Sequence, residues 1–181
     1  MQQLIVQKFG GTSVGSGERI AAVAEIIKKE AEINNVVVVV SAMAGETDRL
    51  IELSKQFGDN QNKREFDALI STGEKVSASL LAMALNSLGL KAKSYSAAQV
   101  SLKTTSNFSK AMILDIDRAK MEEILSDDSI PIITGFQGIT ESGEVTTLGR
   151  GGSDTTAVAI AASIKADRCD IYTDVDGIYT T

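Results

Sequence analysis

The sequence has no histidine, and its 181 residues include only one cysteine and one proline. Without histidine, the chain can form neither Ser-His-Asp nor Cys-His catalytic machinery, and no His-ligated zinc site. The single cysteine, Cys169, allows no internal disulfide and no thiolate metal cluster, and we interpret it as a small buried residue. An enzyme with this composition must work with Lys, Arg, Asp, Glu, hydroxyl groups, backbone amides and, where needed, a hard metal ion.

Excess positive charge and long apolar runs are also missing. The net charge of −6, from 24 acidic and 18 basic residues, argues against nucleic acid or an anionic membrane as the main partner. Hydrophobic residues make up 43% of the chain, but no run is long enough to span a bilayer. No basic segment followed by an apolar one opens the chain, so we expect no secretory signal. A single cysteine fits a reducing compartment, and we expect a cytoplasmic location.

Strand-like and helix-like segments alternate along the chain, which favours an α/β fold with a mainly parallel sheet. The five consecutive valines at 36–40 predict a central strand covered on both faces. The other expected strands are at 3–8, at 91–96, at 130–139, where the strand is buried, and from 169 onward, with a turn at Asp176–Gly177; a hairpin at 140–148 turns at Gly143. The expected helices are at 17–33, at 115–126 and at 153–166, with a short helix ending near Gly58 and a helical region at 62–88 broken near Gly73.

Four polar segments are predicted to follow strands: 8–13, 41–47, 148–154 and 173–177. Ligands of open α/β sheets bind at the carboxyl ends of the strands, so we expect these segments to converge. The first, KFGGTS, combines Lys8 with Gly10 and Gly11 before a helix N-terminus, which suits nucleotide phosphates. It matches neither Walker A nor the dinucleotide glycine pattern, and a glycine turn with a surface lysine remains an alternative.

The third polar segment, LGRGGSDTTA, repeats this arrangement. Arg150 lies between glycines and can bind a carboxylate or phosphate through two hydrogen bonds. Ser153 or Asp154 is expected to cap the following helix, and capping alone would account for Asp154. Two anion-binding segments in one domain suggest two anionic ligands, or a phosphoryl group that passes between them.

Other polar residues are open to two interpretations each. Ser41 and Thr47 either bind a small polar substrate or only stabilise a turn and cap a helix N-terminus. Glu74, if buried, needs a cation partner, which could be a substrate ammonium or Lys75. Contact with solvent would remove that need.

At the end of the chain, Asp174 or Asp176 either lies near magnesium or ribose or belongs to an ordinary Asp-Gly turn. By themselves, Tyr172 and Tyr179 look like packing residues. The absence of histidine is compatible with phosphoryl transfer to a carboxylate, because that acceptor is already ionised at neutral pH and needs no general base.

Three segments carry a family resemblance: KFGGTSV at 8–14, GRGGSDTTA at 149–157 and YTDVDGIYTT at 172–181. In sequence and in their order along the chain they resemble the motifs of aspartokinases, which belong to the amino-acid kinase superfamily. The resemblance spans nearly the whole chain. VVVVVSAMAGETD and ISTGEKVSA fall where that family has its substrate segments. The resemblance implies a three-layer αβα sandwich, the amino-acid kinase fold, truncated at its C-terminal end.

The resemblance also implies an activity: ATP-dependent phosphorylation of the side chain of L-aspartate to 4-phospho-L-aspartate and ADP, the first step towards lysine, threonine and methionine. It implies that Mg²⁺ arrives with the nucleotide, without metal ligands from the protein, and that the full-length protein is a homo-oligomer. Position by position, it implies catalytic roles for Lys8 and Asp154, substrate binding by Ser41, Thr47, Glu74, Arg150 and Ser153, and nucleotide binding by Lys8, Phe9, Gly10, Gly11, Thr12, Ser13, Thr173, Asp174 and Tyr179.

Aspartokinases continue past the point where this chain stops. We therefore expect residues 1–181 to hold the substrate-binding portion and the start of the nucleotide-binding portion, without an ACT regulatory domain. The chain alone is then expected to have weak or no kinase activity and no feedback inhibition. The alternatives are a kinase of the same fold acting on glutamate, acetylglutamate, carbamate or UMP, and a ligand-binding fragment without turnover.

Overall fold

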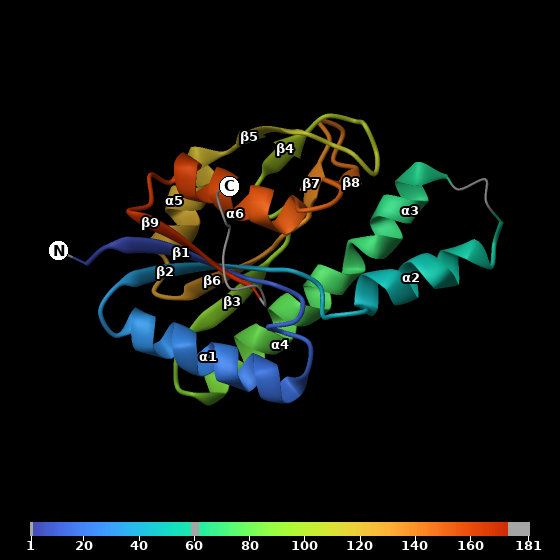
Figure 1. The fold of residues 1–181 in the computed structure, drawn as a ribbon. Helices are drawn as coiled ribbons and strands as arrows, with labels where there is room; N and C mark the ends of the chain where they lie inside the picture. The colour runs from blue at the N-terminus through green and yellow to red at the C-terminus, as the bar shows by residue number, and fades with distance from the viewer. Residues whose placement is uncertain (1, 59–61, 174–181) are drawn as a thin grey trace, which may run out of the picture.

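A computed structural model describes residues 2–58 and 62–173, and its centre is a five-stranded parallel sheet (Figure 1). The strand order is β3-β6-β2-β1-β9, and every neighbouring pair is parallel. The strands are β1 (Leu4–Phe9), β2 (Asn35–Val40), β3 (Ala92–Tyr95), β6 (Ile130–Thr134) and β9 (Arg168–Tyr172). The valines of β2 are all buried, so the prediction of a central strand is confirmed.

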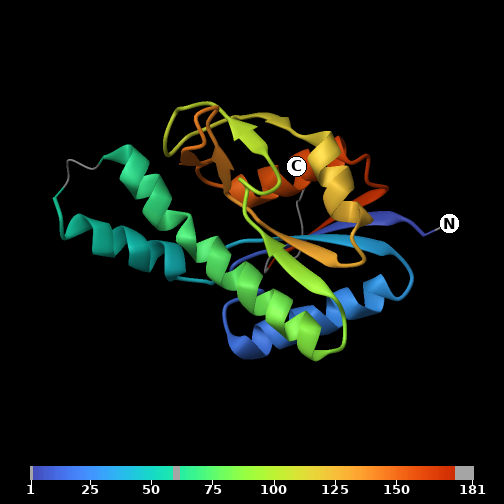
Figure 2. The ribbon, with the colours of Figure 1, turned by 180° about the vertical axis from the view of Figure 1, so that it is seen from behind.

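Two pairs of helices cover the two faces of this sheet (Figures 1 and 2). On one face lie α1 (Gly17–Ala31) and α4 (Thr72–Ser87), and on the other lie α5 (Arg118–Ser126) and α6 (Gly152–Ser163). The three-layer αβα arrangement expected from the sequence is confirmed. Since parallel strands expose both faces to helices, the side chains of β2 alternate between the two cores, with Val38 in one and Val39 in the other.

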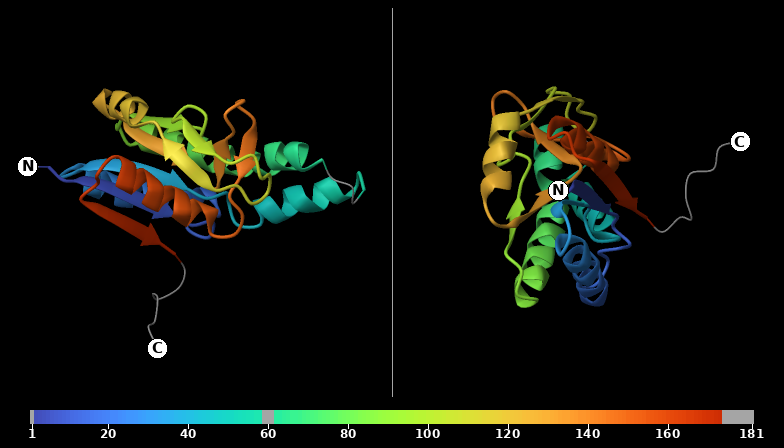
Figure 3. Two further views of the ribbon diagram at one scale, coloured as in Figure 1. Left: turned by 90° about the horizontal axis from the view of Figure 1, so that it is seen from above. Right: turned by 90° about the vertical axis from the view of Figure 1, so that its left-hand side faces the viewer.

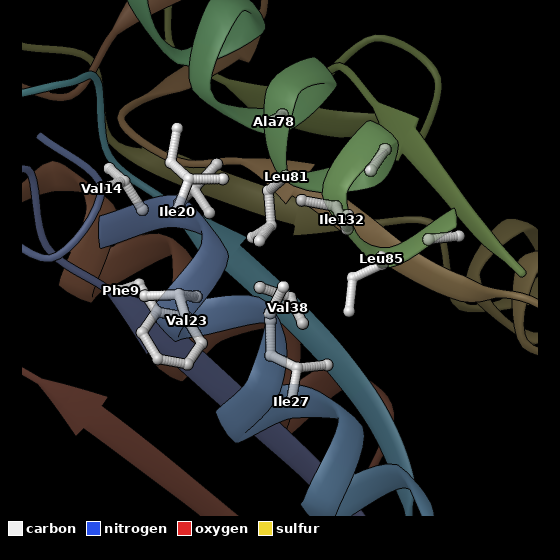
Figure 4. Close-up of a cluster of buried hydrophobic side chains, with 14 of the residues drawn as sticks. Phe9, Val14, Ile20, Val23, Ile27, Val38, Ala78, Leu81, Leu85 and Ile132 are labelled. Carbon is white, nitrogen blue, oxygen red and sulfur yellow. The ribbon is translucent and has the colours of Figure 1, made fainter. Parts of the chain in front are cut away.

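The core under α1 and α4 is built from aliphatic side chains and the ring of Phe9 (Figure 4), and Tyr172 packs against it. Ile27 of α1 and Leu81 of α4 are fully buried against Val38 of the sheet. Each such side chain contributes about 2 kcal/mol by leaving water. This packing fixes the positions of the strand ends that carry the polar segments.

A helical arm projects from the sheet and consists of α2 (Glu46–Lys55) and α3 (Lys63–Ile70) (Figures 1 and 3). The predicted break in the helical region 62–88 occurs at Ser71, two residues before the expected Gly73. The stretch Lys63–Ser87 is long and apolar enough to cross a membrane, but half of its apolar window is buried. One face of α4, with Ala78, Leu81 and Leu85, packs on the sheet, whereas Val76 and Met83 on the helix are exposed.

A second, four-stranded sheet lies on the same side of the parallel sheet as α5 and α6 (Figures 1 and 2). Its strands, in the order β5-β4-β7-β8, are β4 (Leu102–Thr104), β5 (Ile113–Ile116), β7 (Gln137–Ile139) and β8 (Val145–Thr147). A hairpin turning at Gly143 is confirmed, but its first strand is β7, which lies before the expected start at residue 140. Sequence analysis missed β4 and β5, whose short, partly polar stretches lack a clear strand pattern.

Two predicted elements need correction. The strand expected at 130–139 is two strands in different sheets, because the backbone turns at Phe136, whose φ of +67° is outside the strand region. The helix expected from residue 115 begins at Arg118, because the side chain of Asp117 accepts a hydrogen bond from the amide of Lys120 and caps it. Asp115 and Ile116 belong to β5 instead.

Candidate active site

The predicted catalytic and substrate-binding residues meet around one cavity of about 310 Å³. Such a volume is at the small end of ligand sites and fits a small metabolite. The cavity is lined by Lys8, Ser41, Ala42, Thr47, Glu74, Phe136, Gly149, Arg150, Gly151, Gly152, Ser153 and Asp154. Three of the four polar segments therefore converge on it from β1, β2 and α6, together with the first turn of α4.

Lys8 and Asp154 form an ion pair at the edge of the cavity. The distance between Lys8 Nζ and Asp154 Oδ1 is 2.5 Å, and Lys8 is only 7% exposed. The expectation that Ser153 or Asp154 caps α6 is wrong, because the cap residue is Gly151, with a left-handed φ of +75°. Asp154 lies instead in the first turn of α6, where its carboxylate forms the ion pair with the ammonium group of Lys8.

The glycine segment after β1 offers backbone donors to an anion. The N–H of Gly10 donates to the carbonyl of Tyr172 on β9 at 3.1 Å, so it is already used. Within residues 2–58 and 62–173, the amides of Gly11, Thr12 and Ser13 have no hydrogen-bond acceptor. Three successive free amides beside Lys8 form a feature that a phosphate oxygen can use.

Gly11 can be tested directly, since a Cβ atom there would lie 2.7 Å from the carbonyl oxygen of Ala42. We expect Gly11→Ala to move the loop or the end of β2, and to lower the free energy of unfolding by about 1–3 kcal/mol. Gly17→Ala is the matched control: nothing lies within 4 Å of its added methyl group, so stability should hold or rise. Urea denaturation of both variants gives the comparison, and equal stabilities would contradict this account of the loop.

Arg150 lies between two glycines with left-handed backbones, Gly149 at φ +79° and Gly151 at φ +75°. The side chain is exposed and, within the part of the chain that the structure describes, makes no ion pair. A free guanidinium group at the edge of a small cavity is suited to bind a carboxylate through two parallel hydrogen bonds.

Glu74 lies in the first turn of α4 and is 2% exposed. Its Oε1 accepts a hydrogen bond from the amide of Ala42 at 3.2 Å, whereas Oε2 has no partner among the described residues. Burial raises the pKa of Glu74 to about 7. Lys75 is exposed and forms no ion pair with Glu74, so no cation among the described residues pairs with this carboxylate.

The remaining predicted site residues have varied positions. Ser41, Thr47 and Ser153 line the cavity. Phe9 is fully buried and stacks on Tyr172, with ring centroids 4.6 Å apart, so its side chain cannot reach a nucleotide. Tyr172 is a packing residue, as the sequence indicated. Thr173 is exposed at the end of β9, and Asp174, Asp176 and Tyr179 lie outside the described residues.

Sequence reasoning missed two parts of the cavity wall, Phe136 and Ala42. Phe136 looked like an ordinary residue of a continuous strand, and only its positive φ places it at the cavity. Ala42 contributes a backbone amide, which no side-chain pattern indicates.

Comparison with known proteins gives consistent results. The model of the amino acid kinase family matches residues 3–181. An aspartate kinase of Pseudomonas putida is 57% identical over 98% of this chain, which covers 44% of that protein. A crystal structure of aspartate kinase from Synechocystis superposes with a TM-score of 0.81 at 49% identity, covering 95% of this chain and 28% of the other. E. coli aspartokinase III in complex with aspartate and ADP gives a TM-score of 0.80 at 29% identity, with 98% and 51% covered.

The chain thus spans less than half the length of the curated relatives it matches. The family match, by contrast, extends over nearly all of its residues and includes the segments that line the cavity. Together with the three-layer fold, this match shows that the chain belongs to the amino acid kinase family.

Proposed function

We propose that this chain forms the substrate-binding portion, and the start of the nucleotide-binding portion, of an aspartokinase catalytic domain. The reaction is transfer of the γ-phosphoryl group of ATP to the side-chain carboxylate of L-aspartate. The observation that carries the proposal is the buried Glu74 carboxylate, whose Oε2 has no partner among the described residues, in the same cavity as the Arg150 guanidinium, which makes no ion pair with those residues. Relatives named aspartate kinase, and one solved with aspartate and ADP, support the same substrate.

The charges of the cavity suit an amino acid with two carboxylates. Glu74 binds the ammonium group, which supplies the cation that its buried carboxylate lacks. Arg150 binds the α-carboxylate, while Ser41, Thr47 and Ser153 complete the pocket with hydroxyl groups. The side-chain carboxylate then faces Lys8.

Lys8 and the free amides of the glycine segment stabilise the charge that develops during transfer. An oxygen of the substrate carboxylate forms a bond to the γ-phosphorus as the bond from phosphorus to the bridging oxygen of ADP breaks. The acceptor is already ionised, so no proton has to be removed. Asp154 holds Lys8 in place through their ion pair.

Magnesium enters with the nucleotide in this proposal. Among the described residues, no three carboxylate, histidine or cysteine groups cluster as a metal site. The donor set fits Mg²⁺ bound mainly by phosphate oxygens and water, as is common for nucleotide-bound magnesium. We also propose a cytoplasmic location, a homo-oligomeric full-length protein and a place at the start of lysine, threonine and methionine synthesis.

Calorimetric titration with L-aspartate and coupled measurement of ADP release test the proposal. We expect the chain to bind L-aspartate and to bind L-glutamate, N-acetylglutamate and UMP at least about tenfold more weakly, because the cavity fits the shorter side chain. ADP release should depend on aspartate and be slow. If another acceptor binds more tightly, that acceptor would take the place of aspartate as the proposed substrate. If none of them binds, the proposed function is contradicted.

A further inference from the structure

Asp67 of α3 is a fully buried carboxylate that accepts four hydrogen bonds. Its Oδ2 accepts the backbone amides of Ser109 and Thr147, both at 2.8 Å. Its Oδ1 accepts the hydroxyl groups of the same two residues, both at 3.0 Å. Each partner therefore donates once to each oxygen, and no ion pair to Asp67 is found in the described part of the chain.

One side of this network leads to the loop of Arg150. Thr147 ends β8, three positions before Arg150 in the sequence. Its carbonyl accepts the amide of Ala111 at 2.9 Å, and the carbonyl of Ser109 lies 3.5 Å from where a Cβ of Gly149 would be. Ser109 itself has a φ of +68°, a conformation that a non-glycine residue keeps only when its surroundings hold it.

The other side of the network leads to Glu74. Asp67 lies in the last turn of α3, which ends at Ile70, and Glu74 is in the first turn of the next helix. The buried Nε2 of Gln137 donates to the carbonyl of Ser71 at 2.9 Å, and Gln137 is the partner of Thr147 in the β7–β8 register. The junction of α3 and α4 is thus fixed to the same pair of strands.

We propose that Asp67 is a positioning residue that fixes the separation between Glu74 and the loop of Arg150. The carboxylate has no contact with the cavity and acts only through its four hydrogen bonds. A rigid separation selects a substrate whose ammonium and carboxylate groups span it. The effect on substrate affinity rests on the proposed function, whereas the effect on the loop does not.

Three single variants separate positioning from stability. Asp67→Ala leaves two amides and two hydroxyl groups without their acceptor. In Asp67→Asn, the amide oxygen can accept the two N–H groups, and the NH₂ group can donate to the two hydroxyl oxygens. Thr104→Val is the matched control, because it removes a buried 2.6 Å hydrogen bond to Thr146 in the same sheet without touching the arm.

Hydrogen exchange and aspartate titration on the whole chain give two readouts. In Asp67→Ala, we expect the amides of 107–112 and 148–152 to exchange at least about tenfold faster, and aspartate to bind at least about tenfold more weakly. Asp67→Asn should stay near wild type in both. Thr104→Val should lower the melting temperature with neither change. Unchanged exchange at 148–152 in a folded Asp67→Ala protein would overturn the proposal.

The two proposals can fail separately. If wild type does not bind aspartate, the proposed function fails, and the exchange of 148–152 still decides the role of Asp67. Should Asp67→Ala not fold, the double variant Ser109→Ala/Thr147→Val removes the two hydroxyl donors and keeps both amides. It should speed exchange of 148–152 relative to Thr104→Val, and equal exchange in the two proteins would refute the positioning role.

Discussion

Replacing Lys8 by Met should reduce ADP release by at least about a hundredfold, because the ammonium group is the full positive charge placed to stabilise the migrating phosphoryl group. Met has a similar length and suits the site, where Lys8 is 7% exposed. Asp154, left without its partner, is about half exposed and can be hydrated, so the fold should persist. Aspartate should still bind, since Glu74 and Arg150 are unchanged.

Two measurements separate turnover from binding. Coupled ADP release at high protein concentration measures turnover, and calorimetric titration with Mg-ATP and with aspartate measures the affinity for each ligand. Lys29→Met is the control, an exposed lysine on α1 away from the cavity. Asp154→Asn should give a smaller loss, about tenfold, because Lys8 keeps its charge and loses only its fixed orientation. Turnover and Mg-ATP affinity of Lys8→Met close to those of wild type would remove Lys8 from the mechanism.

Replacing Glu74 by Gln should weaken aspartate binding by about a hundredfold, because a neutral amide cannot pair with the substrate ammonium in a buried site. The amide oxygen can still accept the hydrogen bond from Ala42. Binding to wild type should also depend on pH. With the pKa of Glu74 raised to about 7, the carboxylate is mostly protonated at pH 6 and mostly ionised at pH 8. Affinity should rise about tenfold between these values.

Stability should change in the opposite direction with pH. The folded state holds the proton of Glu74 up to its raised pKa of about 7, whereas the unfolded chain releases it near the ordinary glutamate pKa of 4.5. The folded state thus binds more protons in between, and its free energy of unfolding falls as pH rises through this range, by about 3 kcal/mol for this group. Glu74→Gln should lack that slope and be more stable than wild type at pH 8.

Urea denaturation at pH 5 and pH 8, with calorimetry at pH 6 and pH 8, covers both effects. Glu141→Gln, at an exposed carboxylate of the β7–β8 hairpin, is the control and should leave both profiles unchanged. An aspartate affinity that is pH-independent in wild type, or equal in the Gln variant, would show that Glu74 does not bind the ammonium group.

The parallel sheet and the convergence of the polar segments were predictable, because they follow from strong local patterns. The valine run fixes a buried central strand, and parallel strands bring their carboxyl ends, with Lys8 and Ser41, to one edge. The second sheet was not predictable to the same degree. Its strands are short, and one of them, β7, continues a buried stretch from which only the backbone turn at Phe136 separates it.

The details of the cavity depend on tertiary contacts that no pattern encodes. By local pattern Asp154 looked like a helix cap, and only the family resemblance implied a catalytic role for it together with Lys8. The approach of β1 to α6 makes it the partner of Lys8. Phe9 belongs to the glycine segment by sequence, yet the strand alternation sends its ring into the core. No sequence pattern singled out Asp67, because the four groups that donate hydrogen bonds to it belong to two distant segments.

The hydrogen bond from Gly10 to Tyr172 makes the anion-binding capacity of the first loop depend on the edge of the sheet. While β9 is paired with β1, the amides of Gly11, Thr12 and Ser13 have no acceptor within residues 2–58 and 62–173. Detachment of β9 would release a fourth. The pairing of the outermost strand therefore decides whether the N–H group of Gly10 is available to an anion.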